Sequence, residues 1–341
     1  MEGKKVLVTG ATGYVGGWVV KYLLEEGNKV HITVRNKSNQ QKYAHLIELA
    51  KASNGDLEVY EADLMKEDSF IEPMQGCEYV FHIASPFIIN GIKNPQKQLI
   101  EPALNGTRGV LNAVNKTESV KRVVLTSSLA AIYGDARDMQ DKGLSEYTEE
   151  HWNTSSNLKH QPYSYSKVLA EKEATKIHGE QNRWALSIIN PGFVMGPSLT
   201  THSNSGSIQF INDLISGKQK MGVPELNFAF VDVRDVAKAH ILAADKESDG
   251  RHCVVEKSLS MLEVSKILAN KYGDKYALPK NQLPKFMLYL FGWTQGVTVK
   301  FISRNVGYNI LFNNSKSKHA LELSYHPVEE SFVEMIEQMV K

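Results

Sequence analysis

Short runs of β-branched and other apolar residues alternate with longer amphipathic stretches from Lys5 to about Asn190, and this alternation restricts the fold more than any other feature. The runs are nearly continuously apolar, as strands buried on both faces must be. A helical pattern follows the first run, over Tyr14 to Glu26, and Gly27 is placed to end it. Parallel strands joined by helices must pack back on one sheet, so the sequence predicts an α/β fold with a doubly wound parallel sheet. The expected strands cover residues 6–9, 30–34, 57–60, 79–83, 123–126 and 186–189.

The composition excludes several functional classes. The 341 residues include 39 Lys plus Arg and 38 Asp plus Glu, a formal net charge of +1, so the chain lacks the surplus of cations that binding to nucleic acid or to an anionic membrane needs. Two cysteines, Cys77 and Cys253, stand far apart, which excludes a disulfide framework and a thiolate zinc site. The eleven histidines show no paired ligand spacing, so we predict no metal.

The sequence gives no sign of export or of a membrane span. The first residues lead directly into a strand pattern rather than a signal peptide, and the longest near-apolar run, Phe286 to Trp293, is too short to cross a bilayer. We therefore expect a cytoplasmic protein. The apolar run itself fits either a lid over a substrate or, more commonly, packing between helices.

A glycine-rich turn joins the first expected strand to the first helix. Gly10, Gly13 and Gly16 stand at the spacing Gly-x-x-Gly-x-x-Gly, and Thr12, Tyr14 and Val15 complete the segment. Glycines allow the backbone to turn sharply and to approach a pyrophosphate, which the positive end of the helix dipole then stabilises. A tight turn without a ligand is the alternative, but the position after the first strand favours a dinucleotide site of the Rossmann type.

The end of the second expected strand predicts which dinucleotide is bound. Folds that prefer NAD place an acid there to hold the ribose 2′-hydroxyl, whereas this chain has Arg35. The planar guanidinium of Arg35 suits a 2′-phosphate, and Lys42 adds a second charge unless both are ordinary surface cations. We therefore predict NADP(H). Asp63, after the third strand, is placed either to accept a hydrogen bond from adenine or to cap a helix.

A tyrosine and a lysine four residues apart mark the reactive centre. Tyr163 and Lys167 share one face of a helix that Pro162 opens, and an ammonium near a phenol is expected to lower the tyrosine pKa. A second Tyr-x-x-x-Lys, at Tyr276, includes Pro279 and so does not fit a helix. Ser128 follows the fifth strand, at the sheet edge where open α/β sheets hold their active sites, and its hydroxyl suits a carbonyl oxygen.

The chain after Pro191 is less regular. Residues 195–230 are rich in Ser, Gly, Asn and Pro and suggest loops with one helix near 208–216. Regular patterns return as strands near 228–231 and 253–255 and as helices near 233–244, 262–272 and 328–340. We expect an NADP-binding domain over residues 1–190, with returning segments near 228–256, and a smaller, mainly substrate-binding region over 191–341.

These motifs resemble those of the extended short-chain dehydrogenase/reductase family, in its dihydroflavonol-reductase-like branch. The similarity extends over nearly the whole chain. It is carried by Val8–Gly16, Val34-Arg35, Ala62–Leu64, Phe81–Pro86, Asn105–Thr107, Val123–Ser128, Tyr163 with Lys167, Asn190–Val194 and Val231–His240. The branch also includes cinnamoyl-CoA reductases, fungal carbonyl (methylglyoxal) reductases and bacterial aldehyde reductases.

The resemblance implies a role for each matching residue. Tyr163 would donate a proton, Lys167 would lower its pKa and hold the nicotinamide ribose, and Ser128 would orient the carbonyl. The remaining cofactor contacts it implies are Arg35 and Lys42 at the 2′-phosphate, Asp63 and Leu64 at adenine, Ala84 and Ser85 at the ribose, Pro191 and Val194 at the nicotinamide, and Ser207. Ser85, Phe87, Tyr133 and Phe193 are candidate substrate contacts.

The chain departs from its named relatives at two substrate positions. Plant dihydroflavonol reductases carry Asn where this chain has Tyr133, and the segment from His160 to Lys167 differs from that of cinnamoyl-CoA reductases. We therefore expect an NADPH-dependent reductase of small aldehydes or ketones, and the sequence leaves its oligomeric state open. A nucleotide-sugar epimerase or dehydratase of the same fold, and a non-catalytic NADP-sensing scaffold, are the alternatives. Arg35 disfavours the first, and the presence of Tyr163 and Lys167 disfavours the second.

Overall fold

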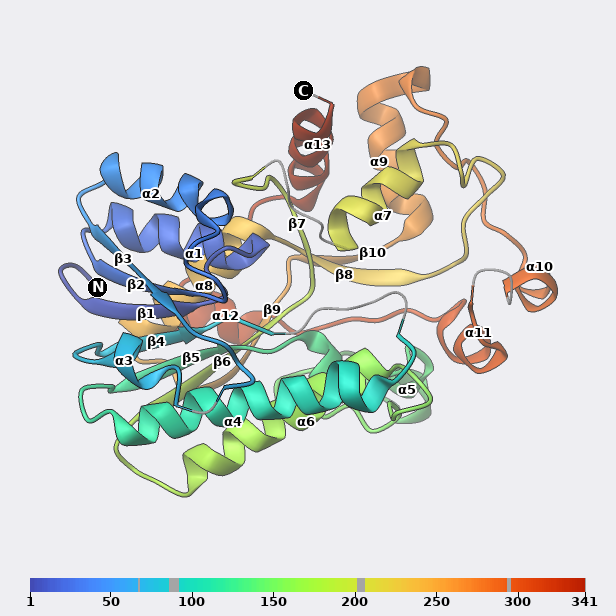
Figure 1. Cartoon of the computed structure of the whole chain (residues 1–341). Helices are drawn as coiled ribbons and strands as arrows, with labels where there is room; N and C mark the ends of the chain where they lie inside the picture. Colours follow the sequence, from blue (N-terminus) through green and yellow to red (C-terminus); the bar gives the residue numbers. More distant parts are fainter. Residues whose placement is uncertain (67, 86–91, 201–205, 293–295, 341) are drawn as a thin grey trace.

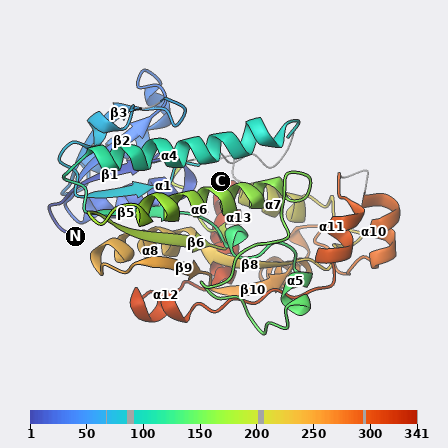
Figure 2. The ribbon, with the colours of Figure 1, turned by 90° about the horizontal axis from the view of Figure 1, so that it is seen from below.

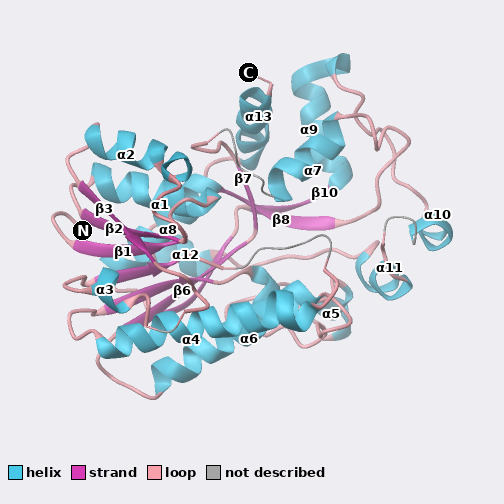
Figure 3. Ribbon diagram, in the orientation of Figure 1, coloured by secondary structure: helices cyan, strands magenta, loops and turns pink. Residues whose placement is uncertain are grey.

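A computed structural model of the chain describes residues 1–66, 68–85, 92–200, 206–292 and 296–340. Its main element is a seven-stranded sheet in the order β3-β2-β1-β4-β5-β6-β9, and every neighbouring pair is parallel. The strands are β1 Lys5–Thr9, β2 Lys29–Val34, β3 Asp56–Glu61, β4 Tyr79–His82, β5 Arg122–Thr126, β6 Ala185–Pro191 and β9 Gly250–Val254. The predicted doubly wound sheet is confirmed, and Figures 1 and 3 show it between two layers of helices.

Helices cover both faces of this sheet. The helices are α1 Tyr14–Glu25, α2 Ala44–Lys51, α3 Ile71–Met74, α4 Glu101–Lys116, α5 Arg137–Asp141, α6 Pro162–Gly179, α7 Gly206–Ile215, α8 Val233–Asp245, α9 Met261–Tyr272, α10 Lys285–Phe291, α11 Val299–Asn305, α12 Ser315–Ala320 and α13 Val328–Met339. One face packs against α1, α2 and α8, and the other against α3, α4 and α6, which gives two separate apolar cores. Helices α4 and α6 lie side by side in both views (Figures 1 and 2).

A second, three-stranded sheet lies beside the carboxyl ends of the main strands. It has the order β10-β8-β7, with β7 Phe193–Met195, β8 Asn227–Asp232 and β10 Lys257–Ser260. Its core is built with α7, α9 and α13 around Phe230 and Phe332. Within the segment 228–256, β8 therefore belongs to the small sheet, whereas α8 and β9 return to the large one.

The apolar run that begins at Phe286 forms α10, and most of its large side chains are exposed. Phe286, Leu290 and Phe291 are 63%, 59% and 59% exposed, so the expectation of ordinary interhelical packing is wrong for these side chains. Trp293, which ends the run, lies outside the described residues.

Within the described part of the chain, no helix combines the length and the apolar character that crossing a membrane requires.

Candidate active site

The glycine-rich turn connects β1 to α1 at the carboxyl edge of the main sheet. Gly10 has a φ of +70°, and a Cβ there would lie 2.7 Å from the backbone nitrogen of Ala84, so the turn contacts the segment leaving β4. A Cβ at Gly16 would overlap the carbonyl oxygen of Gly10. Both positions therefore require glycine, because backbone approaches backbone there.

The N-terminus of α1 is open toward this edge. Gly13 is the N-cap, no side chain among the described residues caps it, and the first turn contains no acidic residue. Thr12 is exposed, and Tyr14 and Val15 are partly buried. Uncapped backbone N–H groups at the positive end of a helix dipole fit a pyrophosphate, so the donors suit a dinucleotide.

The residues predicted to bind the far end of the dinucleotide follow β2 and β3. Arg35 and Lys42 are both exposed after β2, and β3 pairs directly with β2. The carboxylate of Asp63 accepts the backbone N–H of Met65 at 2.9 Å, so it stabilises a turn rather than capping a helix. Leu64 packs against α4, where a Cβ on Gly106 would lie 3.2 Å from its side chain.

The segment leaving β4 is held by buried polar contacts. Thr9 Oγ1 accepts the backbone N–H of Ala84 at 3.1 Å and lies 2.9 Å from His82 Nδ1. Burial lowers the pKa of His82 to about 3, so this histidine is neutral at physiological pH. His82 is therefore a hydrogen-bonded residue of the core, as its position inside a strand suggests.

The structure brings the predicted catalytic residues together. Ser128 follows β5, whereas Tyr163 and Lys167 lie on the first turns of α6. The Ser128 side chain is hydrogen-bonded to Tyr163, and Lys167 Nζ lies 5.9 Å from the centroid of the tyrosine ring. Lys167 Nζ also donates to Ser85 Oγ at 3.0 Å, and this contact connects α6 to the segment after β4.

The pKa of Tyr163 moves in the direction opposite to the one expected from the sequence. Burial raises it above its ordinary value of 10, and the hydrogen bond with Ser128 opposes that shift only in part. The ammonium of Lys167 lies over the tyrosine ring at 5.9 Å from its centroid and donates to Ser85, and it does not outweigh burial. Burial also lowers the pKa of Lys167 to about 8, although the carboxylate of Glu171 acts in the other direction.

Residues from both sheets border this centre. Leu64, Ala84, Ser85 and Lys167 line one pocket between the main sheet and α4. Pro191 ends β6, and Val194 lies in β7, where its carbonyl accepts a hydrogen bond from the hydroxyl of Ser207 on α7. Two predicted cofactor contacts, Val194 and Ser207, are thus directly hydrogen-bonded to each other.

The candidate substrate contacts belong to two aromatic clusters. Tyr133 packs against Tyr147 and Phe312, and Phe193 packs against Phe210 and Phe230 of the smaller region. Phe87 lies outside the described residues. In the described residues no group of three or more histidine, cysteine or acidic side chains is arranged to hold a metal ion.

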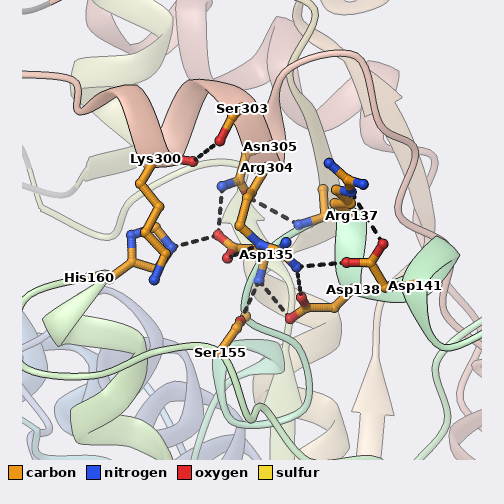
Figure 4. A network of polar contacts seen from close by, with 12 residues as sticks. Asp135, Arg137, Asp138, Asp141, Ser155, His160, Lys300, Ser303, Arg304 and Asn305 are labelled. Atoms are coloured by element: carbon orange, nitrogen blue, oxygen red, sulfur yellow. Dashed lines mark hydrogen bonds and ion pairs between the residues drawn. The ribbon is translucent and has the colours of Figure 1, made fainter.

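A buried polar network centred on Asp135 connects the segment between β5 and α5, the start of α6 and α11 (Figure 4). Asp135, which is 0% exposed, accepts hydrogen bonds from His160 at 2.8 Å, Gln161 at 2.7 Å and Asn305 at 2.7 Å. Its second oxygen accepts a hydrogen bond from Arg304 at 2.8 Å. Gln161, the N-cap of α6, has a φ of +54°, so this network fixes the turn that introduces Tyr163.

Sequence reasoning missed Asp135, Glu171 and Arg304. Glu171 is four residues after Lys167 on the helix face that carries the predicted catalytic pair, and an acid at that spacing was a signal that could have identified it. The partners of Asp135 lie 25 and 170 residues away in His160 and Asn305, and no spacing pattern connects residues so distant.

Comparisons with known proteins agree with this geometry. Residues 6–255 match the model of the NAD dependent epimerase/dehydratase family. A cinnamoyl-CoA reductase of Medicago truncatula is 39% identical over 99% of this chain and 96% of its own length. An anthocyanidin reductase of Vitis vinifera is 37% identical over 81% of this chain and 83% of its own.

Solved structures extend the likeness to the whole fold. Yeast methylglyoxal/isovaleraldehyde reductase Gre2, complexed with NADPH, is 29% identical with a TM-score of 0.80, and the match covers 98% of each chain. Vestitone reductase from alfalfa is 26% identical with a TM-score of 0.72 and covers 98% of this chain and 97% of its own. The predicted resemblance to dihydroflavonol-reductase-like proteins is confirmed, and the chain belongs to the NAD dependent epimerase/dehydratase family.

Proposed function

We propose that this protein is an NADPH-dependent reductase that converts the carbonyl group of a small aldehyde or ketone to an alcohol. The observation that carries the proposal is the convergence of Ser128, Tyr163 and Lys167 beside a glycine-rich turn that fits a pyrophosphate. The reductase names of the relatives support the same reaction class. When bound, NADPH supplies the hydride.

The side chains divide the remaining work. Tyr163 keeps its proton at neutral pH because burial raises its pKa, so it is ready to protonate the carbonyl oxygen as negative charge develops there. Ser128 is bonded to the tyrosine hydroxyl and so can hydrogen-bond the same oxygen. Lys167, held by Ser85, places a positive charge beside the phenol. This charge stabilises the negative charge that the phenol oxygen gains as Tyr163 gives up its proton.

Arg35 supports NADPH rather than NADH as the reductant. It follows β2, where an NAD-specific fold has an acid, and its side chain is exposed at the sheet edge. The guanidinium can bind a 2′-phosphate through two parallel hydrogen bonds. Lys42, also exposed, adds a second cation in the segment that follows β2.

The proposed substrate class is supported by the aromatic character of two candidate substrate contacts. Tyr133 and Phe193 provide aromatic surface from two different clusters, which suits an apolar body attached to the reacting carbonyl. The candidates are short-chain and aromatic aldehydes and ketones, in line with the methylglyoxal/isovaleraldehyde reductase among the similar structures.

The test measures the oxidation of NADPH by its absorbance, with each substrate of this panel, and is repeated with NADH. We expect turnover of at least one aldehyde or ketone, preference for NADPH, and a loss of about a thousandfold or more in kcat for Tyr163→Phe, since the proton donor is removed. Tyr165→Phe, two residues along the same helix, is the matched control and should retain activity.

Other outcomes would contradict the proposal. Tightly bound NAD in the purified protein, without net oxidation of NADPH, would favour an epimerase or dehydratase. NADPH binding without turnover of any substrate would favour a sensing scaffold.

We also propose that the protein acts in the cytoplasm. Both cysteines are buried and unpaired, as a reducing compartment permits.

A further inference from the structure

Glu171 is a buried acid that the proposed reaction leaves unexplained. It lies one turn after Lys167 on α6, and only 1% of its surface is exposed. Its Oε2 accepts hydrogen bonds from the hydroxyl of Ser127 and from Asn190 Nδ2, the latter at 2.8 Å. Burying an isolated carboxylate costs free energy, and these hydrogen bonds offset part of that cost. The partners therefore suggest that the acid has a role at this position.

These partners lie next to the reacting groups. Ser127 immediately precedes Ser128, and Asn190 Nδ2 also donates to the carbonyl oxygen of Ser128 at 3.1 Å. Asn190 in turn precedes Pro191, the predicted nicotinamide neighbour at the end of β6. A single carboxylate on α6 thus connects the helix that carries Tyr163 and Lys167 to the ends of β5 and β6.

Arg251 on β9 pairs with this carboxylate and favours its ionised form. Its Nε lies 2.5 Å from Glu171 Oε1, and its guanidinium stacks over the Trp152 ring at 4.1 Å from the centroid. Arg251 Nη1 also donates to the carbonyls of Glu149 and His151 at 2.7 and 2.6 Å, so the cation is held in place from the other side. Burial raises the pKa of Glu171, and Arg251 is the strongest opposing influence.

The surroundings of Lys167 contain one balancing charge. On α6 it faces Tyr163 and Glu171, from β4 it faces His82, and from the segment after β4 it meets Ser85. His82 is neutral, and so is His240 of α8, which lies behind the end of β5 at 2.6 Å from Thr126. Among the residues that the structure describes, Glu171 is therefore the anion that stabilises the Lys167 ammonium.

We propose that Glu171 is a positioning residue of the active site: its carboxylate fixes α6 against the ends of β5 and β6 and maintains Lys167 as an ammonium. The inference rests on the proposed function, since it concerns the same reaction. In this proposal an acid outside the Ser–Tyr–Lys group controls the charge of Lys167. Without the carboxylate, only the effect of burial on Lys167 would remain, and burial favours the neutral amine.

Glu171→Gln tests this role because glutamine keeps the size and one acceptor oxygen but removes the charge. We expect the alkaline midpoint of kcat/KM to fall by about one pH unit relative to the wild type, because an opposite charge at short range is lost. Glu173→Gln is the matched control: Glu173 lies on the same helix but pairs with Arg108 at the surface, so the midpoint should stay unchanged. A Glu171→Gln profile that overlays the wild type would overturn the proposal.

A second variant covers the case in which Glu171→Gln does not fold. Arg251→Met removes the cation that most strongly favours the ionised form of Glu171, so the alkaline midpoint should fall as in Glu171→Gln, and a rise would contradict the proposal. The pH dependence of NADPH binding, followed by fluorescence, gives the same comparison without a carbonyl substrate. Failure of the wild type to bind or oxidise NADPH would refute the proposed function, whereas a functioning wild type with unmoved midpoints would refute the role of Glu171 alone.

Discussion

Individual side chains at this site gain their chemical properties from burial more than from sequence neighbours. Tyr163 and Lys167 are four residues apart, yet the pKa of the tyrosine rises because the phenol is buried, and the lysine donates to Ser85 instead. The four-residue spacing predicts that the two side chains lie close together, whereas the direction of the tyrosine shift depends on burial. The difference matters, since a protonated phenol is the form that reduction requires.

At the residue scale, Arg35 is expected to determine the choice of cofactor. Arg35→Asp removes the cation and introduces the acid that binds a ribose 2′-hydroxyl, so the KM for NADPH should rise by about tenfold or more while that for NADH falls. Steady-state kinetics with both cofactors measure the change. Lys37→Asp, also exposed just after β2, is the control, and an equal effect there would show that general surface charge rather than Arg35 sets the preference.

At the scale of elements, the junction between β1 and α1 depends on backbone contacts that a methyl group would block. Gly16→Ala places a Cβ against the Gly10 carbonyl and must displace the turn, so we expect NADPH affinity to fall at least about tenfold and the melting temperature to decrease. Gly17→Ala is the neighbouring control, because its Cβ would lie 3.5 Å from the Leu199 side chain, an ordinary contact. Isothermal titration with NADPH and thermal unfolding distinguish the two variants.

The same scale explains which elements the sequence could predict. The strands around Val6 and Val123 and the helix opened by Pro162 follow from local apolar patterns and a helix-initiating residue, and each is confirmed within a few residues. α10 differs, because an apolar run indicates burial only if another element covers it. Phe286 and Leu290 remain exposed, and nothing local to the run distinguishes that outcome.

At the scale of the whole molecule, Asp135 connects three distant segments and should contribute to stability. Replacing it with Asn removes the buried charge that Arg304, His160 and Asn305 contact, although Arg304 keeps its other buried partner, Asp138, so Asp135→Asn is expected to lower the free energy of unfolding by about 3 kcal/mol. Asp141→Asn, which removes a contact of Arg304 at a 41% exposed side chain, should cost less than about 1 kcal/mol. Denaturant unfolding measures both, and equal losses would contradict a special role for Asp135.

Asp135 also predicts how stability depends on pH. Burial raises its pKa, but the hydrogen bonds from Asn305, His160 and Arg304 outweigh burial and hold it below the ordinary value. A carboxyl whose pKa is lower in the folded state stabilises the fold above its unfolded pKa, about 4, and this contribution is lost as pH falls toward the folded value. The melting temperature of the wild type should therefore decline more steeply below pH 4 than that of Asp135→Asn, and parallel curves would count against the assignment.

The sequence by itself determined the parallel sheet, the glycine turn and the identity of Ser128, Tyr163 and Lys167, because these depend on local periodicity and on short fixed spacings. Tertiary structure alone decided the bond of Ser207 to Val194, the place of Glu171 between Ser127, Asn190 and Arg251, and the Asp135 network. Each of these joins segments far apart in the chain, and their contacts and desolvation arise only when separate strands and helices pack together. Burial also set the protonation of the reactive pair, and burial is a property of the folded chain rather than of any segment of it.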